Sequence, residues 1–179
     1  MRYASLKNLF EIKGDITEIY ITNKKGQKFT VLIDTEDFDK IKKHSWSATE
    51  KKKNSGVFYV RCGAGPEGKY LSIHKCILNY PSSLMCDHIN RNPLDNRKSN
   101  LRLCTNQQNS FNKPPSVKNK TGVTGVHFSK QTNKWTVQMR INGKAKHYGL
   151  FSNFEEAVKR RKELEEEHHG EFKYTSQEI

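Results

Sequence analysis

The chain has 179 residues, of which 34% are hydrophobic, and its mean hydropathy is −0.89. Such a chain forms one medium domain or two small ones with a modest core, and a membrane segment is excluded because no apolar run approaches the roughly 20 residues that span a bilayer. The formal net charge of +13 predicts a polyanionic partner, against the alternative of a basic surface that binds nothing. The excess is densest in residues 84–120, which carry 7 basic and 2 acidic side chains.

The cysteines and the N-terminus indicate the compartment. Cys62, Cys76, Cys86 and Cys104 have no C-x-x-C spacing, so free thiols in a reducing compartment are favoured over a structural zinc site. The N-terminus lacks the sustained apolar core of a signal peptide. We therefore expect a cytoplasmic protein that is not bound to a membrane.

Residues 1–83 are interpreted as a small α+β accessory region. Two alternating apolar segments, Thr17–Thr22 and Lys28–Ile33, are separated by Lys24-Lys25-Gly26, which is typical of a β-hairpin. A short helix is expected over Glu36–Lys43, with Asp34 or Thr35 as its cap. Further strands are expected at Trp46, Val57–Val60 and Tyr70–Ile73, followed by a helical turn over His74–Leu78.

The most informative stretch begins at Cys86 and reads CDHINRNPLDNRKSNLRLCTNQQNSFN. A carboxylate (Asp87) and an amide oxygen (Asn109) are ligands that Mg²⁺ or Mn²⁺ accepts, and such an ion keeps several waters. The imidazole of His88 titrates near neutral pH and can deprotonate water, and Asn100 is the candidate that orients its ring. Because neighbouring strand residues point to opposite faces, Asp87 and His88 reach one site only at a twist, a bulge or a strand end.

The Asp-His, LDNR, SNLR and QQN elements in this order resemble the HNH nuclease motif, in the variant with asparagine in place of the last histidine. The resemblance implies a ββα-metal fold over residues 84–112, with strands at Met85–Ile89 and Leu101–Cys104 and a helix that begins near Thr105. It assigns water activation to His88, positioning to Asn100 and metal binding to Asp87 and Asn109. This variant resembles phage and intron-encoded homing enzymes, so the choice between nicking and double-strand cleavage stays open.

Other polar residues of the motif have two interpretations. Asn96, in the LDNR turn, is expected to close the loop rather than take part in chemistry. His74, in the apolar segment LSIHKCIL, is expected to be a hydrogen-bonded core residue rather than a site residue. Four basic side chains are candidates for phosphate contacts, or alternatively solvated surface charges: Arg91, Arg97, Lys98 and Arg102.

Residues 113–120 form the expected linker, stiffened by Pro114-Pro115, and a separate domain is expected over 121–179. In this domain Asn142-Gly143 predicts a hairpin turn. A helix is expected over Phe154–His169, capped by Ser152 or Asn153 and ended by Gly170. The three expected strands are Gly125–Ser129, Lys134–Ile141 and Ala145–Leu150. The fold class is thus α+β, with a ββα-metal core between an α+β region and a three-stranded antiparallel sheet packed on one helix.

This segment, with GVTGVHF, KWTVQMRINGK, HYGLF and HGEF, resembles the ethylene-response-factor (APETALA-two-type) DNA-binding domain. That family lays a three-stranded sheet in the major groove and packs a helix behind it. Alternation places the apolar residues of KWTVQMRI toward the helix and the polar ones on the other face, where Arg and Gln donors read bases. The expected DNA-facing residues are His127, Ser129, Thr136, Gln138, Arg140 and His147.

Together these features predict a metal-dependent HNH DNA endonuclease of the homing type, acting on double-stranded DNA in the host cytosol if a phage encodes it. One DNA-recognition domain and one catalytic centre suggest a monomer that binds an asymmetric site. The first alternative is a DNA-binding protein whose nuclease motif is degenerate, and a zinc-stabilised RNA-binding protein is a more distant one. Double-stranded RNA is disfavoured because its deep, narrow major groove does not admit such a sheet.

Overall fold

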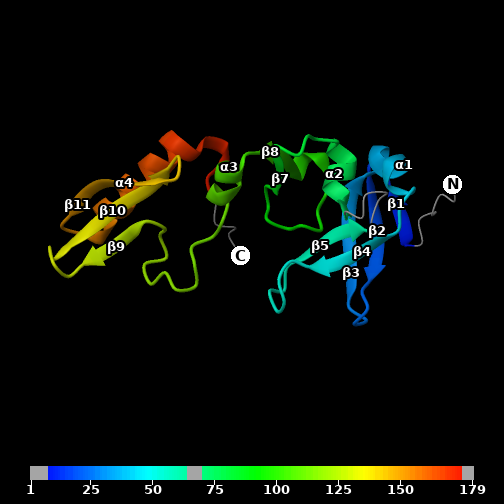
Figure 1. The fold of residues 1–179 in the computed structure, drawn as a ribbon, viewed down its shortest axis with the longest axis horizontal. Coiled ribbons are helices and arrows are strands. Elements are labelled where there is room, and N and C mark those ends of the chain that lie inside the picture. The colour runs from blue at the N-terminus through cyan, green and yellow to red at the C-terminus, as the bar shows by residue number, and fades with distance from the viewer. Residues whose placement is uncertain (1–7, 64–69, 175–179) are drawn as a thin grey trace. The chain divides into compact units, whose positions relative to one another are not determined.

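The computed structural model describes residues 8–63 and 70–174. The chain divides into two units, residues 1–105 and 106–179, and each is described by itself (Figure 1). Small antiparallel sheets and a few helices make up both units, so the predicted α+β class is confirmed. No helix in the described parts of the chain is long and apolar enough to cross a bilayer.

The first sheet of the N-terminal unit has the order β1-β2-β3 and is antiparallel throughout. Its strands are β1 (Leu9–Lys13), β2 (Ile16–Thr22) and β3 (Lys28–Asp34). The predicted hairpin is confirmed, and the Asn23 side chain accepts hydrogen bonds from Lys25 N and Gln27 N in its turn. Strand β1 was not predicted, because its residues are exposed along its whole length and leave no buried face for a pattern to show.

A second antiparallel sheet has the order β4-β5-β6 and shares one core with the first. The remaining early elements are η1 (Thr35–Asp37), α1 (Phe38–Ile41), β4 (Trp46–Glu50), β5 (Phe58–Cys62), β6 (Leu71–Ser72) and α2 (Ile73–Leu78). The predicted helix is therefore a 3-10 turn followed by one α-helical turn. Ile19, Val31, Ile33 and Ile41 are fully buried in the core, which Leu101 joins from the motif.

The motif strands β7 (Met85–His88) and β8 (Leu101–Cys104) form the predicted antiparallel pair. The connection between them includes η2 (Lys98–Asn100), and it also pairs with the N-terminal sheet. Leu32 N donates to Leu94 O at 2.8 Å, and Asn96 N donates to Leu32 O at 2.7 Å. The motif loop is thus bonded along the free edge of β3.

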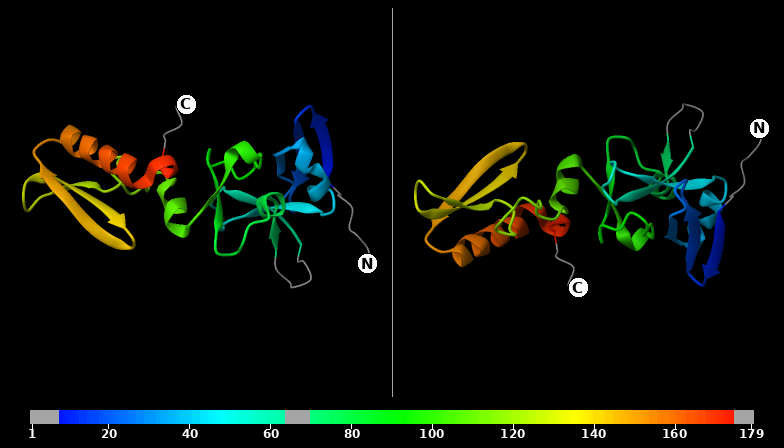
Figure 2. Two further views of the ribbon diagram at one scale, coloured as in Figure 1. Left: turned by 90° about the horizontal axis from the view of Figure 1, so that it is seen from above. Right: turned by 90° about the horizontal axis from the view of Figure 1, so that it is seen from below.

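The C-terminal unit begins with α3 (Asn106–Phe111), followed by a sheet of order β11-β10-β9. Its other elements are β9 (Val126–Ser129), β10 (Lys134–Ile141), β11 (Lys144–Phe151), α4 (Phe154–His169) and η3 (Gly170–Phe172). Helix α4 lies along one face of the sheet (Figure 2). The Asn153 side chain caps α4 by accepting from Glu156 N at 2.8 Å, and the helix ends before Gly170, as predicted. The domain boundaries predicted from sequence stay a prediction.

Gly125 is required where β9 approaches β10. It has φ +79°, and a Cβ there would lie 2.1 Å from the carbonyl oxygen of Gln138. The Gly125 carbonyl also accepts from Gln138 N at 2.9 Å, so neither backbone segment is free to move away. Gly122 has a similar φ of +71° with nothing within 4 Å of a Cβ, which makes it a matched control.

We expect Gly125→Ala to destabilise the protein by about 2 kcal/mol more than Gly122→Ala, because only the former adds a backbone clash to left-handed strain. Urea unfolding of the two variants and the wild type measures the difference. Equal losses of stability in both variants would show that the backbone at Gly125 and Gln138 shifts without cost to make room for the added methyl group.

Candidate functional site

The two motif residues Asp87 and His88 lie at the end of β7. Asp87 is opposite Arg102 on β8, and His88 is opposite Leu101, so the two side chains begin on opposite faces of the hairpin. His88 is the last residue of the strand, which is one of the three positions that allow both to reach one site. Both side chains are nearly buried, with 7% of Asp87 and 6% of His88 exposed.

The imidazole of His88 is oriented by Asn96. His88 Nε2 lies 3.1 Å from Asn96 Oδ1, and Asn96 Nδ2 donates to Pro93 O at 3.1 Å. An amide oxygen only accepts, so Nε2 carries the proton and Nδ1 is the basic nitrogen. Asn96 is fully buried and its backbone bonds to β3, which makes it a rigid support.

The prediction that Asn100 orients the His88 ring is therefore corrected. Asn100 Nδ2 donates to Asp95 O at 2.7 Å, and Asn100 Oδ1 accepts from Asn90 N at 2.8 Å. The Asn100 carbonyl also accepts from Ile89 N at 2.9 Å. Asn100 holds the turn directly after His88, because its side chain, at the end of η2, is engaged by the backbone groups of Asn90 and Asp95. A direct catalytic part for Asn100 stays a prediction.

Two further aromatic side chains approach His88. The His74 ring from α2 lies 5.5 Å from the His88 ring, edge to face, and the Tyr59 ring from β5 lies 6.5 Å away. Sequence reasoning gave neither a site role: the apolar neighbours of His74 suggested core packing, and Tyr59 belongs to a short strand without a motif. The period-2 pattern of Phe58–Cys62, which turns Tyr59 away from the core, was the available signal.

Burial lowers the pKa of both histidines. The pKa of His74 falls to about 4 through burial, with the neighbouring His88, Arg61 and Lys75 adding to the effect. Burial lowers the pKa of His88 as well, against the opposing effects of the Asn96 hydrogen bond and the Asp87 and Asp95 charges. Both rings are therefore neutral near pH 7, and His88 is in the form that accepts a proton.

The Asp87 carboxylate is engaged by Arg102. Asp87 Oδ2 accepts from Arg102 Nε at 3.0 Å and from Nη2 at 2.8 Å. A nearly buried carboxylate is a suitable oxygen ligand for a hard divalent cation, which would share it with the guanidinium. Asn109 lies on α3, in the C-terminal unit, so the assignment of Asp87 and Asn109 as joint ligands stays a prediction.

The basic side chains of the motif loop make internal ion pairs. Arg97 donates from Nε and Nη2 to the buried Asp95, at 2.8 and 2.7 Å. Lys98 Nζ lies 2.6 Å from Glu36 and 3.0 Å from Asp37. The Arg97 pair lies within the loop and the Lys98 pairs join the loop to η1, so phosphate binding by Arg97 and Lys98 would compete with these contacts.

Arg91 has a left-handed backbone, with φ 61°, and its N–H donates to His88 O at 2.8 Å. It therefore closes a tight turn directly after the catalytic candidate. The phosphate contacts predicted for Arg91 and Arg102 stay predictions, as do those for Arg97 and Lys98.

The sheet of the C-terminal unit gathers the six predicted DNA-facing residues on one face. Directly opposite residues share a face in antiparallel pairs. His127 pairs with Thr136, and Gln138 pairs with His147. Ser129 pairs with Lys134, which shares a face with Thr136 because the two are two residues apart on β10. Arg140 lies on the same face for the same reason, two residues after Gln138. A register shift between Val137 and Gln138 keeps His147 in this face.

Thr136 departs from the expectation of an accessible face, since only 8% of it is exposed. It lies on the central strand between His127 and Leu150, whose longer side chains flank its small one. His127, Gln138, Arg140 and His147 are exposed, and Ser129 is half-buried. Four of the six predicted residues are therefore freely presented, and base contact by any of them stays a prediction.

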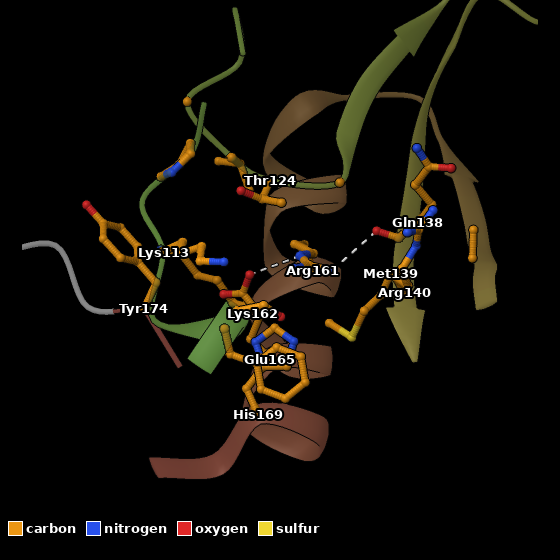
Figure 3. Close-up of a pocket in the computed structure, with 17 residues that line it drawn as sticks. Lys113, Thr124, Gln138, Met139, Arg140, Arg161, Lys162, Glu165, His169 and Tyr174 are labelled. Carbon is orange, nitrogen blue, oxygen red and sulfur yellow. Dashed lines mark hydrogen bonds and ion pairs between the residues drawn. The ribbon is translucent and has the colours of Figure 1, made fainter. Parts of the chain in front are cut away.

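A cavity of about 580 Å³ lies between α4 and the start of the sheet within the C-terminal unit (Figure 3). Arg161 points into it from α4, where Nη1 donates to Gln138 O at 3.3 Å and Nε donates to Glu165 at 2.9 Å. Only 4% of Arg161 is exposed. A buried charge must be paired, and this pairing fixes α4 against the bulged strand.

His169 closes the lower end of this cavity, and its ring stacks on Phe111 with centroids 3.7 Å apart. Burial lowers the pKa of His169 to about 4, and the charges of Arg161 and His168 add to the effect. The unfolded chain, with an ordinary imidazole pKa, binds the proton first as pH falls. The contribution of the neutral His169 to the free energy of unfolding is therefore fully present above about pH 6.5, and it is lost as the pH falls toward 4.

Between pH 7 and pH 5 we expect the wild type to lose about 1 kcal/mol more stability than His169→Phe, after allowing for screening by nearby solvent. Phenylalanine keeps the stacking and removes the titration. Urea unfolding at both pH values measures this, with the exposed His127→Gln, on β9, as the control. Parallel losses for wild type and His169→Phe would contradict the assignment.

The orientation of His88 gives a spectroscopic prediction. We expect its neutral ring to be the Nε2–H tautomer, detected in two-bond ¹H–¹⁵N spectra of the imidazole, because Asn96 Oδ1 accepts from Nε2. Asn96→Ala should mix the tautomers, whereas Asn92→Ala, in the exposed part of the same loop, should leave the pattern unchanged. A wild-type ring protonated on Nδ1 would refute the geometry.

Comparisons with known proteins cover the motif and its surroundings. Residues 79–111 match the model of a family described as HNH endonuclease. An uncharacterised HNH endonuclease of Acanthamoeba polyphaga mimivirus is 56% identical over 46 residues, which are 26% of this chain and 24% of that protein. Protein 3.8 of Escherichia phage T7 is 34% identical over 64 residues, 36% of this chain and 53% of that protein.

The chain thus spans about a quarter and about half of the lengths of these relatives. No solved structure matches the chain. The matched residues run from the end of α2 to the end of α3, and they include every residue to which the motif assigned chemistry. The chain therefore contains an HNH endonuclease domain and is homologous to an HNH endonuclease.

Proposed function

We propose that this protein is a metal-dependent DNA endonuclease that hydrolyses phosphodiester bonds. The observation that carries the proposal is the His88 ring, held through Nε2 by the buried Asn96 beside Asp87 and inside the matched HNH domain. A base with a fixed ring, a lowered pKa and a neighbouring carboxylate has the features that water activation requires.

The chain's own groups take the following parts. His88 Nδ1 accepts a proton from the attacking water, and Asn96 keeps the ring in position during the transfer. Asn100 and the turn from His88 to Arg91 hold the backbone of the base in place. Asp87 and Asn109 would hold Mg²⁺ or Mn²⁺, which supplies charge neutralisation at phosphorus and at the leaving oxygen.

The C-terminal sheet would select the site on double-stranded DNA, in the manner of an ethylene-response-factor domain. Its support is the shared face of exposed His127, Gln138, Arg140 and His147, whose side chains supply hydrogen-bonding groups suited to base edges. We propose a homing role, with the protein acting as a monomer on an asymmetric site in the host cytosol. The similarity to a phage protein supports this setting.

A non-catalytic DNA-binding protein is the second candidate, and one observation favours it. Arg102 already neutralises Asp87 through two hydrogen bonds to Oδ2, as in a motif that has exchanged its metal for an internal ion pair. The two candidates differ in whether a divalent cation displaces or shares this carboxylate.

We expect the wild type to nick or linearise a supercoiled plasmid carrying the protein's own genomic neighbourhood when Mg²⁺ or Mn²⁺ is present. Loss of general-base catalysis typically costs about 10²–10⁴-fold, so His88→Ala should show no cleavage in the same time, while still binding DNA. EDTA should abolish cleavage, and His168→Ala, on the exposed surface of α4, is the matched control. Plasmid that shifts on a gel but stays intact under all conditions would establish the binding-only alternative.

A further inference from the structure

Strand β5 turns two of its side chains away from the core. Val60 and Cys62 are buried, and the alternate residues Tyr59 and Arg61 therefore lie on the outer face of the β4-β5-β6 sheet. The Tyr59 ring lies 6.5 Å from the His88 ring, and the Arg61 guanidinium carbon lies 5.9 Å from the centre of the Tyr59 ring. Arg61 is thus separated from the catalytic candidate by one aromatic side chain.

The charge of Arg61 is not balanced within the described parts of the chain. No carboxylate there pairs with its guanidinium, unlike Arg97, Arg102 and Arg161, which all have carboxylate partners. Its Nε is buried and has no hydrogen-bond partner. A buried N–H without a partner costs about 1–3 kcal/mol, so this donor requires an explanation.

A groove of about 470 Å³ continues from Arg61 along the same unit. Ser47 and Thr49 line it from β4, and Lys24 and Lys25 line it from the turn between β2 and β3. In Figure 1 that turn lies at the lower end of the first sheet, whereas α1 lies at the upper end. Both lysines are exposed, and neither has an ion-pair partner among the described residues.

The groove has a basic lining with hydroxyl groups between its cations. Among the described residues, Glu50 is the one acidic residue that lines the groove, and its carboxylate already accepts from Gly56 N at 3.0 Å. Several cations along one groove, with the Thr49 hydroxyl among its lining groups, match the repeating phosphates of a nucleic-acid strand. A small anion would need only one of these cations, whereas a DNA strand uses all three.

We propose that Arg61, Lys24 and Lys25 form a phosphate-binding track for the DNA strand that leaves the His88 site. This inference rests on the proposed function and deepens it. Arg61 binds a phosphate close to the one that is cleaved, and the lysines bind phosphates farther along the strand. Residues 1–83, which the sequence presented as an accessory region, would then hold the substrate as well as the motif loop.

The test compares Arg61→Gln and Lys24→Gln/Lys25→Gln with Lys42→Gln/Lys43→Gln. The last variant is the matched control, since it also removes two exposed lysines from the N-terminal unit, but at the α1 end. Binding to a duplex from the protein's own genomic neighbourhood is measured in EDTA over a series of salt concentrations. Cleavage of the same duplex is measured with Mg²⁺, and urea unfolding verifies that each variant is folded.

Each lost phosphate contact should reduce the slope of log K against log salt concentration by about 0.9. We expect a reduction of about one for Arg61→Gln and about two for Lys24→Gln/Lys25→Gln, with an unchanged slope for the control. Arg61→Gln should also reduce the cleavage rate at least as much as it weakens binding, because its phosphate adjoins the reacting one. The turn variant changes exposed loop residues only, so it keeps the test valid if Arg61→Gln fails to fold.

Two outcomes separate this inference from the function on which it rests. Track variants that bind and cut like the wild type would overturn the track while leaving the nuclease intact. A wild type that binds without cutting, together with reduced salt slopes in the track variants, would support the track and refute the nuclease. Equal slope reductions in the track variants and the control would show that only net charge matters, which also overturns the track.

Discussion

The bonding of the motif loop to the free edge of β3 is the constraint on which the candidate site depends. Two backbone hydrogen bonds, Leu32 N to Leu94 O and Asn96 N to Leu32 O, join segments more than 60 residues apart in the sequence. They place Asn96 where its side-chain oxygen meets His88 Nε2. A motif of two short strands has almost no core of its own, so the N-terminal sheets supply the rigidity that holds the His88 ring in place.

The cations of the chain fall into two groups, those paired with carboxylates and those without such a partner among the described residues. In the motif loop, the cations Arg97, Lys98 and Arg102 meet Asp95, the Glu36–Asp37 pair and Asp87, respectively. Buried carboxylates without such partners would be strongly destabilising, so these ion pairs are conditions of folding. Lys24 and Lys25, on the turn between β2 and β3, and Arg61, on the outer face of β5, are among the cations that pair with no carboxylate of the described residues. Local charge density along the sequence therefore does not show which cations are already engaged by carboxylates.

In the C-terminal unit, the bulge in the β10-β11 register has a similar organising effect. Gln138 follows the bulge, and its carbonyl accepts from the buried Arg161 while its N–H donates to Gly125. Helix, central strand and first strand thus meet at one backbone position. This arrangement leaves the side chain of Gln138 exposed on the opposite face, beside His147.

Local periodicity and turn chemistry in the sequence determined most elements, the two faces of the C-terminal sheet and the order of the motif residues. These properties depend on neighbours in the chain. Strand β10 was predicted because its residues alternate between apolar and polar, whereas β1 was not predicted because it is exposed along its whole length. The tertiary structure alone decided that Asn96, rather than Asn100, meets His88, and that the rings of His74 and Tyr59 lie beside it. The tertiary structure also decided which cations form ion pairs within the protein. The physical reason is that side chains 14 to 29 residues from His88 reach it only through the pairing of sheets and the packing of α2, and no pattern along the chain records those distances.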